Sequence, residues 1–309
     1  MTALYMLAAL TVCILLAAFA TFRMAFLSSR RRRDPLETPR SHSVYAPRWE
    51  QVRPLVEELE SLPCETVSIR SRDGLTLRGR YYHFRDGAPV QIQFHGYRSM
   101  ASRDFCGGHK LAREAGHNIL LVDQRAQGRS DGHVITFGIR ERYDCADWAA
   151  YVAARFPAAP ILLVGVSMGA ATVLMAAELP LPPQVKGVIA DSPYTSPAAI
   201  IRKVCGEDRH IPPAVGMPFL QLGSWLYGGF CLDAASAEAA VKNTALPLLV
   251  LHGEADGFVP CAMSRAIAAA GEGVELLTVP GAAHAQGYFE DPQGYRHAMT
   301  TFTRRVLGE

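Results

Sequence analysis

The 309-residue sequence lacks paired cysteine motifs, has little excess charge and contains no internal repeat. Its seven cysteines are odd in number and none forms a C-x-x-C pair, which argues against a disulfide framework and favours a reducing compartment. The net charge of +2 comes with no recognition motif, so we expect no nucleic-acid partner. Charged residues make up 19% of the chain and hydrophobic residues 49%, a balance that excludes a disordered protein.

Signatures of bound cofactors are missing as well. The sequence has neither a glycine-rich P-loop nor a dinucleotide-binding pattern. No group of His, Cys, Asp and Glu has the spacing of metal ligands. We therefore expect neither a cofactor nor a metal ion.

Long hydrophobic runs are absent except at the N-terminus. Residues 2–22 carry no charged side chain, and about 21 residues match the roughly 20 that cross a bilayer as a helix. Arg23 and four arginines at 30–33 follow the run, whereas a secretory signal carries its positive charge before it. We predict a single-pass cell-membrane anchor over residues 1–27, with the following domain in the cytoplasm by the positive-inside rule. A cleaved signal and an interfacial helix are the alternatives.

Residues 28–48 contain three prolines and are predicted to form a linker, and residues 49–309 a single domain. In that domain two alternating strands precede six further strands separated by helical stretches, which predicts a mostly parallel sheet after an antiparallel start. About 50 residues, 195–245, separate the sixth strand from the seventh and are rich in apolar and aromatic side chains. We expect a lid-like insertion there; a longer packed crossover is the alternative.

One strand, at 161–166, runs into the pattern Gly165-x-Ser167-x-Gly169 and continues as a helix of small residues. A tight turn in this context exposes the serine hydroxyl above the sheet, and the glycines avoid backbone collisions. The next amide, that of Met168, lies at a helix N-terminus, where negative charge is favoured. The pattern predicts that Ser167 is a nucleophile.

A serine nucleophile needs a general base, which in turn is oriented by a carboxylate. In this architecture the expected chain order is serine, acid, histidine. Asp256 follows the strand at 248–251, and His284 follows the last strand, at 274–279. Both therefore fall beyond the carboxyl ends of strands, where ligand-handling residues gather. We predict Ser167, Asp256 and His284 as the catalytic residues, with Glu254 and Asp191 as alternative acids.

The chain order Ser167, Asp256, His284 resembles that of the α/β-hydrolase superfamily. Two motifs add to the resemblance, Gly165-x-Ser167-x-Gly169 and His252-Gly253-Glu254-Ala255-Asp256, and it covers roughly residues 64–307. The resemblance implies an α/β-hydrolase fold: a mostly parallel eight-stranded sheet flanked by helices, with a helical lid insertion after the sixth strand. It also implies that the Tyr97 amide, after the third strand, joins the Met168 amide in an oxyanion hole.

A further stretch, Asp123-Gln124-Arg125-Ala126-Gln127-Gly128-Arg129-Ser130, is similar to the family pattern D-x-R-G-x-G-x-S. Ala126 replaces its first glycine, a departure that touches no predicted site residue. Together with the N-terminal span, the body looks like the membrane-anchored bacterial serine hydrolases of the superfamily.

These features predict a serine hydrolase that cleaves carboxylic esters through an acyl-enzyme, with a small hydrophobic ester as substrate. His95, Tyr194 and Trp225 are candidate pocket residues, although packing roles are an alternative for each. A peptidase is a rival, but only about 40 residues separate the anchor from the first strand, too few for the extra domain such enzymes carry. A thioesterase, an acyltransferase and a non-catalytic binding protein of the same fold are further rivals.

Overall fold

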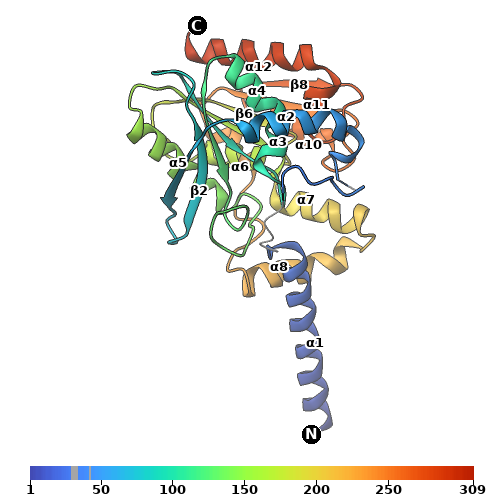
Figure 1. Cartoon of the computed structure of the whole chain (residues 1–309). Coiled ribbons are helices and arrows are strands. Elements are labelled where there is room, and N and C mark those ends of the chain that lie inside the picture. The colour runs from blue at the N-terminus through green and yellow to red at the C-terminus, as the bar shows by residue number, and fades with distance from the viewer. Residues whose placement is uncertain (29–33, 42) are drawn as a thin grey trace.

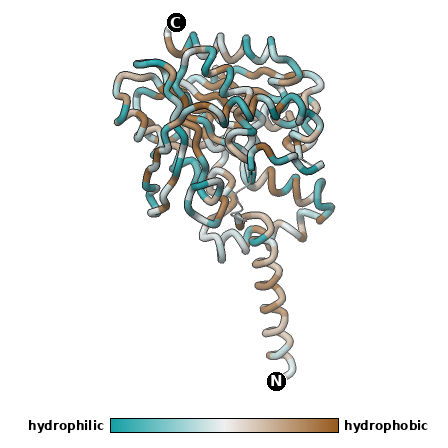
Figure 2. Tube along the Cα trace, in the orientation of Figure 1, coloured by the Kyte–Doolittle hydropathy of each residue, from teal (hydrophilic) through white to brown (hydrophobic). Residues whose placement is uncertain are grey.

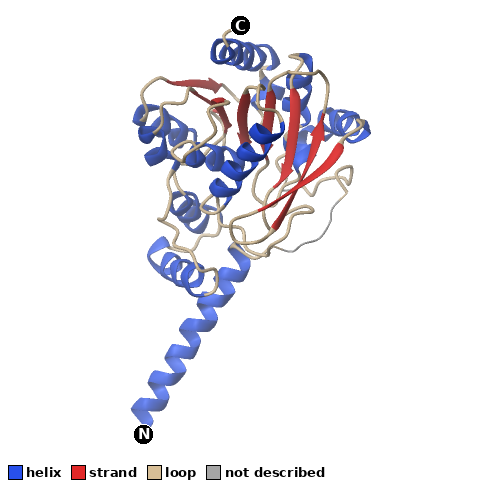
Figure 3. Cartoon of the chain, turned by 90° about the vertical axis from the view of Figure 1, so that its left-hand side faces the viewer, coloured by secondary structure: helices blue, strands red, loops and turns tan. Residues whose placement is uncertain are grey.

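The computed structural model describes residues 1–28, 34–41 and 43–309. An eight-stranded sheet in the order β1-β2-β4-β3-β5-β6-β7-β8 forms its centre, with helices on both faces (Figure 3). Strand β2 is antiparallel to both of its neighbours, and all later pairs are parallel. The strands are β1 (Glu65–Arg70), β2 (Thr76–Tyr82), β3 (Val90–Phe94), β4 (Asn118–Asp123), β5 (Ile161–Val166), β6 (Val185–Asp191), β7 (Leu248–Gly253) and β8 (Val274–Val279).

The central strands are hydrophobic along their whole length because helices cover both of their faces. Every residue of β3 and β5 is buried, whereas β1 alternates towards solvent at the sheet edge. The α/β architecture predicted from the sequence, including the antiparallel start, is thus confirmed. All the parallel strands point their carboxyl ends to one side, and this is where a ligand site is expected.

Helices fill the connections and the two ends of the chain (Figure 1). They are α1 (Thr2–Ala25), η1 (Ala46–Arg48), α2 (Trp49–Ser61), α3 (Ala101–Asp104), α4 (Cys106–Glu114), α5 (Glu141–Arg155), α6 (Met168–Ala176), α7 (Pro197–Lys203), η2 (Val204–Asp208), α8 (Pro213–Leu226), α9 (Ala237–Ala240), η3 (Val241–Asn243), α10 (Cys261–Ala270), α11 (Gly287–Glu290) and α12 (Pro292–Leu307).

Helix α1 projects from the body, and its outer part is mostly apolar, with paler colour near the N-terminus (Figure 2). By length and composition it is able to cross a membrane. Its inner end is packed differently: Ala18, Phe22 and Phe26 are buried, and the helix lies against α8. The chain then pairs Leu27 with Val134 in an isolated bridge, so the inner end of α1 is fixed to the body. The arginines at 30–33, on which the predicted orientation depends, lie outside the described residues.

The segment predicted as a linker is packed against the domain where the structure describes it. The Arg103 side chain donates hydrogen bonds to carbonyl oxygens of Asp34 and Pro35, and Tyr45 is buried. This proline-containing segment is therefore held against the domain by hydrogen bonds to its carbonyl groups and by burial of the Tyr45 ring.

The long insertion consists mainly of α7, η2 and α8 and lies between the body and α1 (Figure 1). Its apolar residues Ile200, Ile201 and Leu220 are buried. Apolar side chains of this insertion are removed from water by packing over the end of the sheet that carries Ser167.

Candidate active site

Ser167 occupies the turn between β5 and α6 and has a left-handed backbone conformation, with φ 56°. A residue with a side chain rarely adopts this conformation, and holding it costs about 1–3 kcal/mol. The turn is fixed by a 2.8 Å hydrogen bond from the Ser167 amide to the Asp191 carbonyl. Both flanking glycines are required by space: a Cβ on Gly165 would lie 2.2 Å from the Gly169 oxygen, and one on Gly169 would lie 1.8 Å from the Phe94 oxygen.

The structure brings the three residues predicted as catalytic into one hydrogen-bonded chain. His284 Nε2 lies 2.9 Å from Ser167 Oγ, and His284 Nδ1 lies 2.6 Å from Asp256 Oδ2. A carboxylate only accepts, so the Nδ1 proton faces Asp256 and the Nε2 lone pair faces the serine hydroxyl. In this arrangement the imidazole can take the serine proton.

Asp256 is held on both of its oxygens. The amides of Phe258 and Val259 each donate to Oδ1 over 2.8 Å. His252 Nε2 lies 3.1 Å from Oδ2 and 2.9 Å from the Val259 carbonyl, so a proton on this nitrogen faces two acceptors. Burial alone would raise the pKa of the Asp256 carboxyl, but hydrogen bonds with His252 and His284 hold the pKa far below its usual range. Asp256 is therefore anionic at neutral pH.

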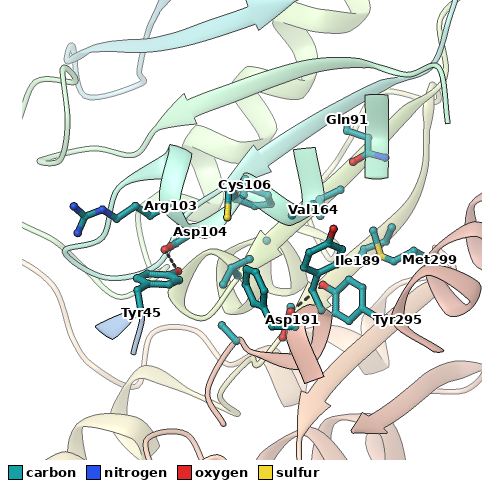
Figure 4. Close-up of a pocket in the computed structure, with 18 residues that line it drawn as sticks. Tyr45, Gln91, Arg103, Asp104, Cys106, Val164, Ile189, Asp191, Tyr295 and Met299 are labelled. Atoms are coloured by element: carbon teal, nitrogen blue, oxygen red, sulfur yellow. Dashed lines mark hydrogen bonds between the residues drawn. The ribbon is translucent and has the colours of Figure 1, made fainter. Parts of the chain in front are cut away.

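The two alternative acids have other partners. Glu254 accepts hydrogen bonds from Thr278 and Arg265 at the surface. Asp191 accepts from the hydroxyls of Ser192 and Tyr295, both over 2.9 Å, and points into a separate cavity of about 30 Å³ (Figure 4). Burial raises the pKa of Asp191, whereas the two hydroxyls lower it, and the net shift is upward. Neither carboxylate bonds to His284.

The loop after β3 approaches the serine closely. A Cβ on Gly96 would lie 3.3 Å from the Ser167 Cβ, so Tyr97, the next residue, borders the hydroxyl. The Gly96 amide donates to Asp104 Oδ2 over 2.6 Å, and the other carboxylate oxygen accepts from the hydroxyl of Tyr45 (Figure 4). On the opposite side Met168 opens α6, where backbone N–H groups lack helical partners. Tyr97 and Met168, the two residues predicted to form an oxyanion hole, line the same cavity as the serine.

The Tyr97 side chain does not reach towards Ser167. Its hydroxyl donates to the carbonyl of Ala25, at the end of α1, over 2.6 Å, and its ring stacks on Phe137 with centroids 4.8 Å apart. Burial raises the pKa of Tyr97 to about 12, despite the opposing charges of Arg98 and Arg209. The phenol therefore stays protonated and keeps its bond to α1.

A cavity of about 230 Å³ opens above the serine. Most of its wall is apolar and comes from three sources: the turn and loops at the sheet end, the insertion, and the last turns of α1. Its lining residues are Thr21, Met24, Ala25, Tyr97, Arg98, Phe137, Ser167, Met168, Tyr194, Ile200, Ile201, Val204, Cys205, Arg209, Ile211, Gly216, Leu220 and Phe258.

Of the three candidate pocket residues, the structure places only Tyr194 in this wall. The expectation for His95 is wrong, because the ring is buried and holds loops together: Gln124 N donates to its Nε2, and its Nδ1 faces the Gly96 carbonyl 2.8 Å away. The expectation for Trp225 is also wrong, because the residue is 61% exposed on α8 and does not line the cavity. Neither residue lines the cavity that contains Ser167.

Sequence reasoning missed the contribution of Thr21, Met24 and Ala25. The only signal was Arg23, which ends the uncharged run without ending the helix, since α1 continues to Ala25.

The backbone at Ala126 shows what the departure from the family pattern D-x-R-G-x-G-x-S means for the turn. It has φ 62°, the left-handed conformation in which a glycine is expected, so the alanine keeps the turn at some cost in strain.

Among the described residues, no group of three or more His, Cys, Asp and Glu could hold a metal ion.

Comparisons with known proteins agree with this fold. A family model described as the alpha/beta hydrolase fold matches residues 94–216. An uncharacterised Mycobacterium tuberculosis protein, Rv2307c, is 28% identical over 97% of this chain and 98% of its own. The thiohydrolase apmlB of Arthrinium phaeospermum is 33% identical over 43% of this chain and 44% of its own.

Among solved structures, the Pyrococcus furiosus esterase Pf2001 superposes with a TM-score of 0.64 at 20% identity, covering 80% of this chain and 93% of its own. At that identity the likeness shows the fold, and it extends over the body. The family model covers the stretch from the end of β3 through the Ser167 turn and into the insertion. The sheet order, the serine turn and these matches lead to one conclusion: the chain has the α/β-hydrolase fold.

Proposed function

We propose that the protein is a serine hydrolase that cleaves carboxylic esters through an acyl-enzyme. The observation that carries this proposal is the hydrogen-bonded chain of Ser167, His284 and Asp256, with Nε2 of the histidine 2.9 Å from the serine oxygen. The strained turn at Ser167 supports it, since strain of this kind persists where function requires it.

In the proposed reaction Ser167 Oγ attacks the ester carbonyl carbon while His284 Nε2 accepts the hydroxyl proton. The carbonyl oxygen becomes an anion that accepts hydrogen bonds from the Met168 and Tyr97 amides, each worth about 3–4 kcal/mol in well-studied enzymes. The C–O bond to the alcohol then breaks, and the alcohol leaves with the proton from His284. Water repeats the sequence on the acyl-enzyme and releases the acid. Asp256 stabilises the imidazolium in both steps.

A thioester is the second candidate substrate, because a relative that matches part of this chain is a thiohydrolase. The acyl-enzyme would be the same, and only the leaving group would differ. Paired oxygen esters and thioesters with one acyl group distinguish the two substrates by their kcat/KM.

We also propose that residues 1–27 form a membrane anchor, that residues 195–245 act as a lid over the pocket, and that the domain of residues 49–309 faces the cytoplasm. The length and apolar surface of α1 support the anchor, and the wall that the insertion contributes to the cavity supports the lid. Protease should cleave the domain in inside-out membrane vesicles and not in right-side-out vesicles. The reverse pattern would overturn the orientation.

The decisive experiment is Ser167→Ala. We expect turnover of short p-nitrophenyl esters to fall by about 10⁶-fold and labelling by a fluorophosphonate probe to disappear, because both need the hydroxyl. Ser236→Ala is the matched control, since Ser236 caps α9 and does not line the cavity. Full turnover in Ser167→Ala would show that the nucleophile is wrong.

A further inference from the structure

The inner end of α1 is built into the pocket. Met24, Thr21 and Ala25 line the same cavity as Ser167, and the Ala25 carbonyl accepts the Tyr97 hydroxyl. The Arg98 side chain donates to the carbonyls of Met24 and Leu27 over 2.9 and 2.8 Å. An anchor that served only to tether the domain would need none of these contacts.

The length of α1 fixes where a membrane surface would lie. An α-helix rises about 1.5 Å per residue, so crossing a hydrocarbon core of about 30 Å takes about 20 residues. On α1 the exposed large apolar side chains run from Leu4 to Phe19, and a hydrocarbon core that covers this run ends near Thr21. Since Thr21 lines the cavity, the edge of the hydrocarbon core lies level with the pocket wall.

Helix α8 lies just on the membrane side of this level, because its partners on α1, Ala18 and Leu15, precede Thr21. Its Gly223 lets the two helices touch, because a Cβ there would lie 2.5 Å from the Ala18 carbonyl oxygen. The Tyr227 hydroxyl donates to the Leu15 carbonyl over 3.1 Å. Beside these contacts Val215, Trp225 and Leu226 are exposed. Exposed apolar side chains with a Trp and a Tyr are typical of a surface at the membrane interface.

The cavity is the right kind of space for an acyl chain. Its wall is apolar, with Ile200, Ile201 and Leu220 opposite the serine turn, and its volume is about 230 Å³. An apolar cavity of about 150 Å³ is known to hold benzene, which has six carbons, so this one has room for about nine. Longer chains would have to extend past Met24 towards the bilayer.

We propose that the substrate is an acyl ester of a membrane lipid, an inference that rests on the proposed esterase function. The acyl chain enters from the bilayer past Met24, beside the packed contact of α1 with α8, and the last turns of α1 form the wall that sets the preferred chain length. The α8 surface formed by Val215, Trp225, Leu226 and Tyr227 rests in the lipid and holds the pocket mouth there.

The chain-length wall is tested on the full chain in lipid nanodiscs, with p-nitrophenyl acetate, octanoate and palmitate as substrates. Met24→Trp should lower the octanoate-to-acetate ratio of kcat/KM at least tenfold, because the indole fills the pocket, and Met24→Ala should raise the palmitate-to-octanoate ratio. Met6→Trp makes the same change on the outer part of α1, where the side chain is 69% exposed, and should leave every rate unchanged. Unchanged ratios in both Met24 variants would overturn the inference, even where Ser167→Ala abolishes all turnover and the esterase function stands.

The membrane contact is tested separately by tryptophan fluorescence. The chain has three tryptophans, of which Trp49 and Trp148 are buried. In nanodiscs of brominated phosphatidylcholine we expect quenching in the unaltered protein that is lost in Trp225→Phe. Equal absolute quenching in the two proteins would mean that the α8 surface does not meet the lipid, and would overturn entry from the bilayer.

Discussion

At the scale of single residues, the site depends on a carboxylate that is buried and bonded on both oxygens. Two amides fix Asp256 Oδ1, while His252 and His284 share Oδ2. His252 in turn is held by Ser264, 2.6 Å from its Nδ1. His252 therefore limits how the Asp256 side chain can rotate.

Asp256→Asn should lower kcat by about 10⁴-fold, because an amide cannot hold His284 in the productive tautomer. Asp191→Asn is the matched control: its side chain keeps the Tyr295 hydroxyl as a partner and does not bond to His284. Steady-state kinetics on a short ester measures both variants. An equal loss in Asp191→Asn would mean that the acid has been misassigned.

At the scale of elements, the serine turn is held in place by the end of β3. A Cβ on Gly169 would lie 1.8 Å from the Phe94 carbonyl oxygen, a contact that backbone cannot relieve without moving the strand or the helix. The turn and the loop carrying Tyr97 therefore form one packed unit. Their relative position does not depend on the insertion above them.

Gly169→Ala should accordingly destabilise the protein by about 3 kcal/mol or more and remove activity. Gly257→Ala serves as the control, because a Cβ there meets no atom within 4 Å, and we expect a change within about 0.5 kcal/mol. Chemical denaturation followed by circular dichroism measures both. Similar stabilities of the two variants would contradict the close packing at Gly169.

A second prediction at this scale concerns α4 and its buried histidine. His109 packs edge-on against the rings of Tyr82 and Phe84, with centroids 4.8 and 5.9 Å away. Burial, with smaller effects from nearby arginines, lowers the pKa of His109 to about 3. The unfolded chain binds this proton near pH 6.5 and the folded chain does not, so stability is lost as the pH falls from about 6.5 towards 3, by up to about 1.4 kcal/mol per pH unit.

His109→Phe should remove this part of the pH dependence, leaving a shallower fall in the free energy of unfolding between pH 6.5 and 4. Urea denaturation at a series of pH values measures the slope. The same substitution at the exposed His297 is the control. An unchanged slope in His109→Phe would mean that the buried ring takes up its proton without unfolding.

Elements were also the scale at which the sequence was most informative. The alternation of strands and helices predicted the sheet, and the strand ends predicted which side chains would meet. Two arrangements carried no such signal. In the sequence, Ala18 and Phe22 cannot be distinguished from the lipid-facing residues of an apolar helix, yet both are buried. Tyr45 and Asp104 are far apart in the sequence and are brought together only by the fold.

At the scale of the whole molecule, the N-terminal helix belongs partly to the folded body. Phe26 is fully buried, with its ring 5.8 Å from Phe137 and 5.3 Å from Phe230, measured between centroids. These contacts join the helix to a loop of the body and to the end of the insertion. The boundary between anchor and domain is therefore a packed interface.

Phe26→Ala should lower the free energy of unfolding by about 3–5 kcal/mol, as expected for a large aromatic lost from a core. Leu10→Ala, on the exposed outer part of α1, should change it by less than about 0.5 kcal/mol. Thermal unfolding of both variants in one detergent gives the comparison. Equal effects would mean that the inner end of α1 is not part of the cooperative unit.

The contact between Ala18 and Gly223 also has a consequence for how the protein is made. About two hundred residues separate these positions along the chain. At a synthesis rate of about 5–20 residues per second, α1 leaves the ribosome roughly 10–40 s before α8 exists to receive it. The wall that is synthesised first can thus close only after α8 has been made, and whatever holds α1 in place during that interval decides whether the pocket is completed.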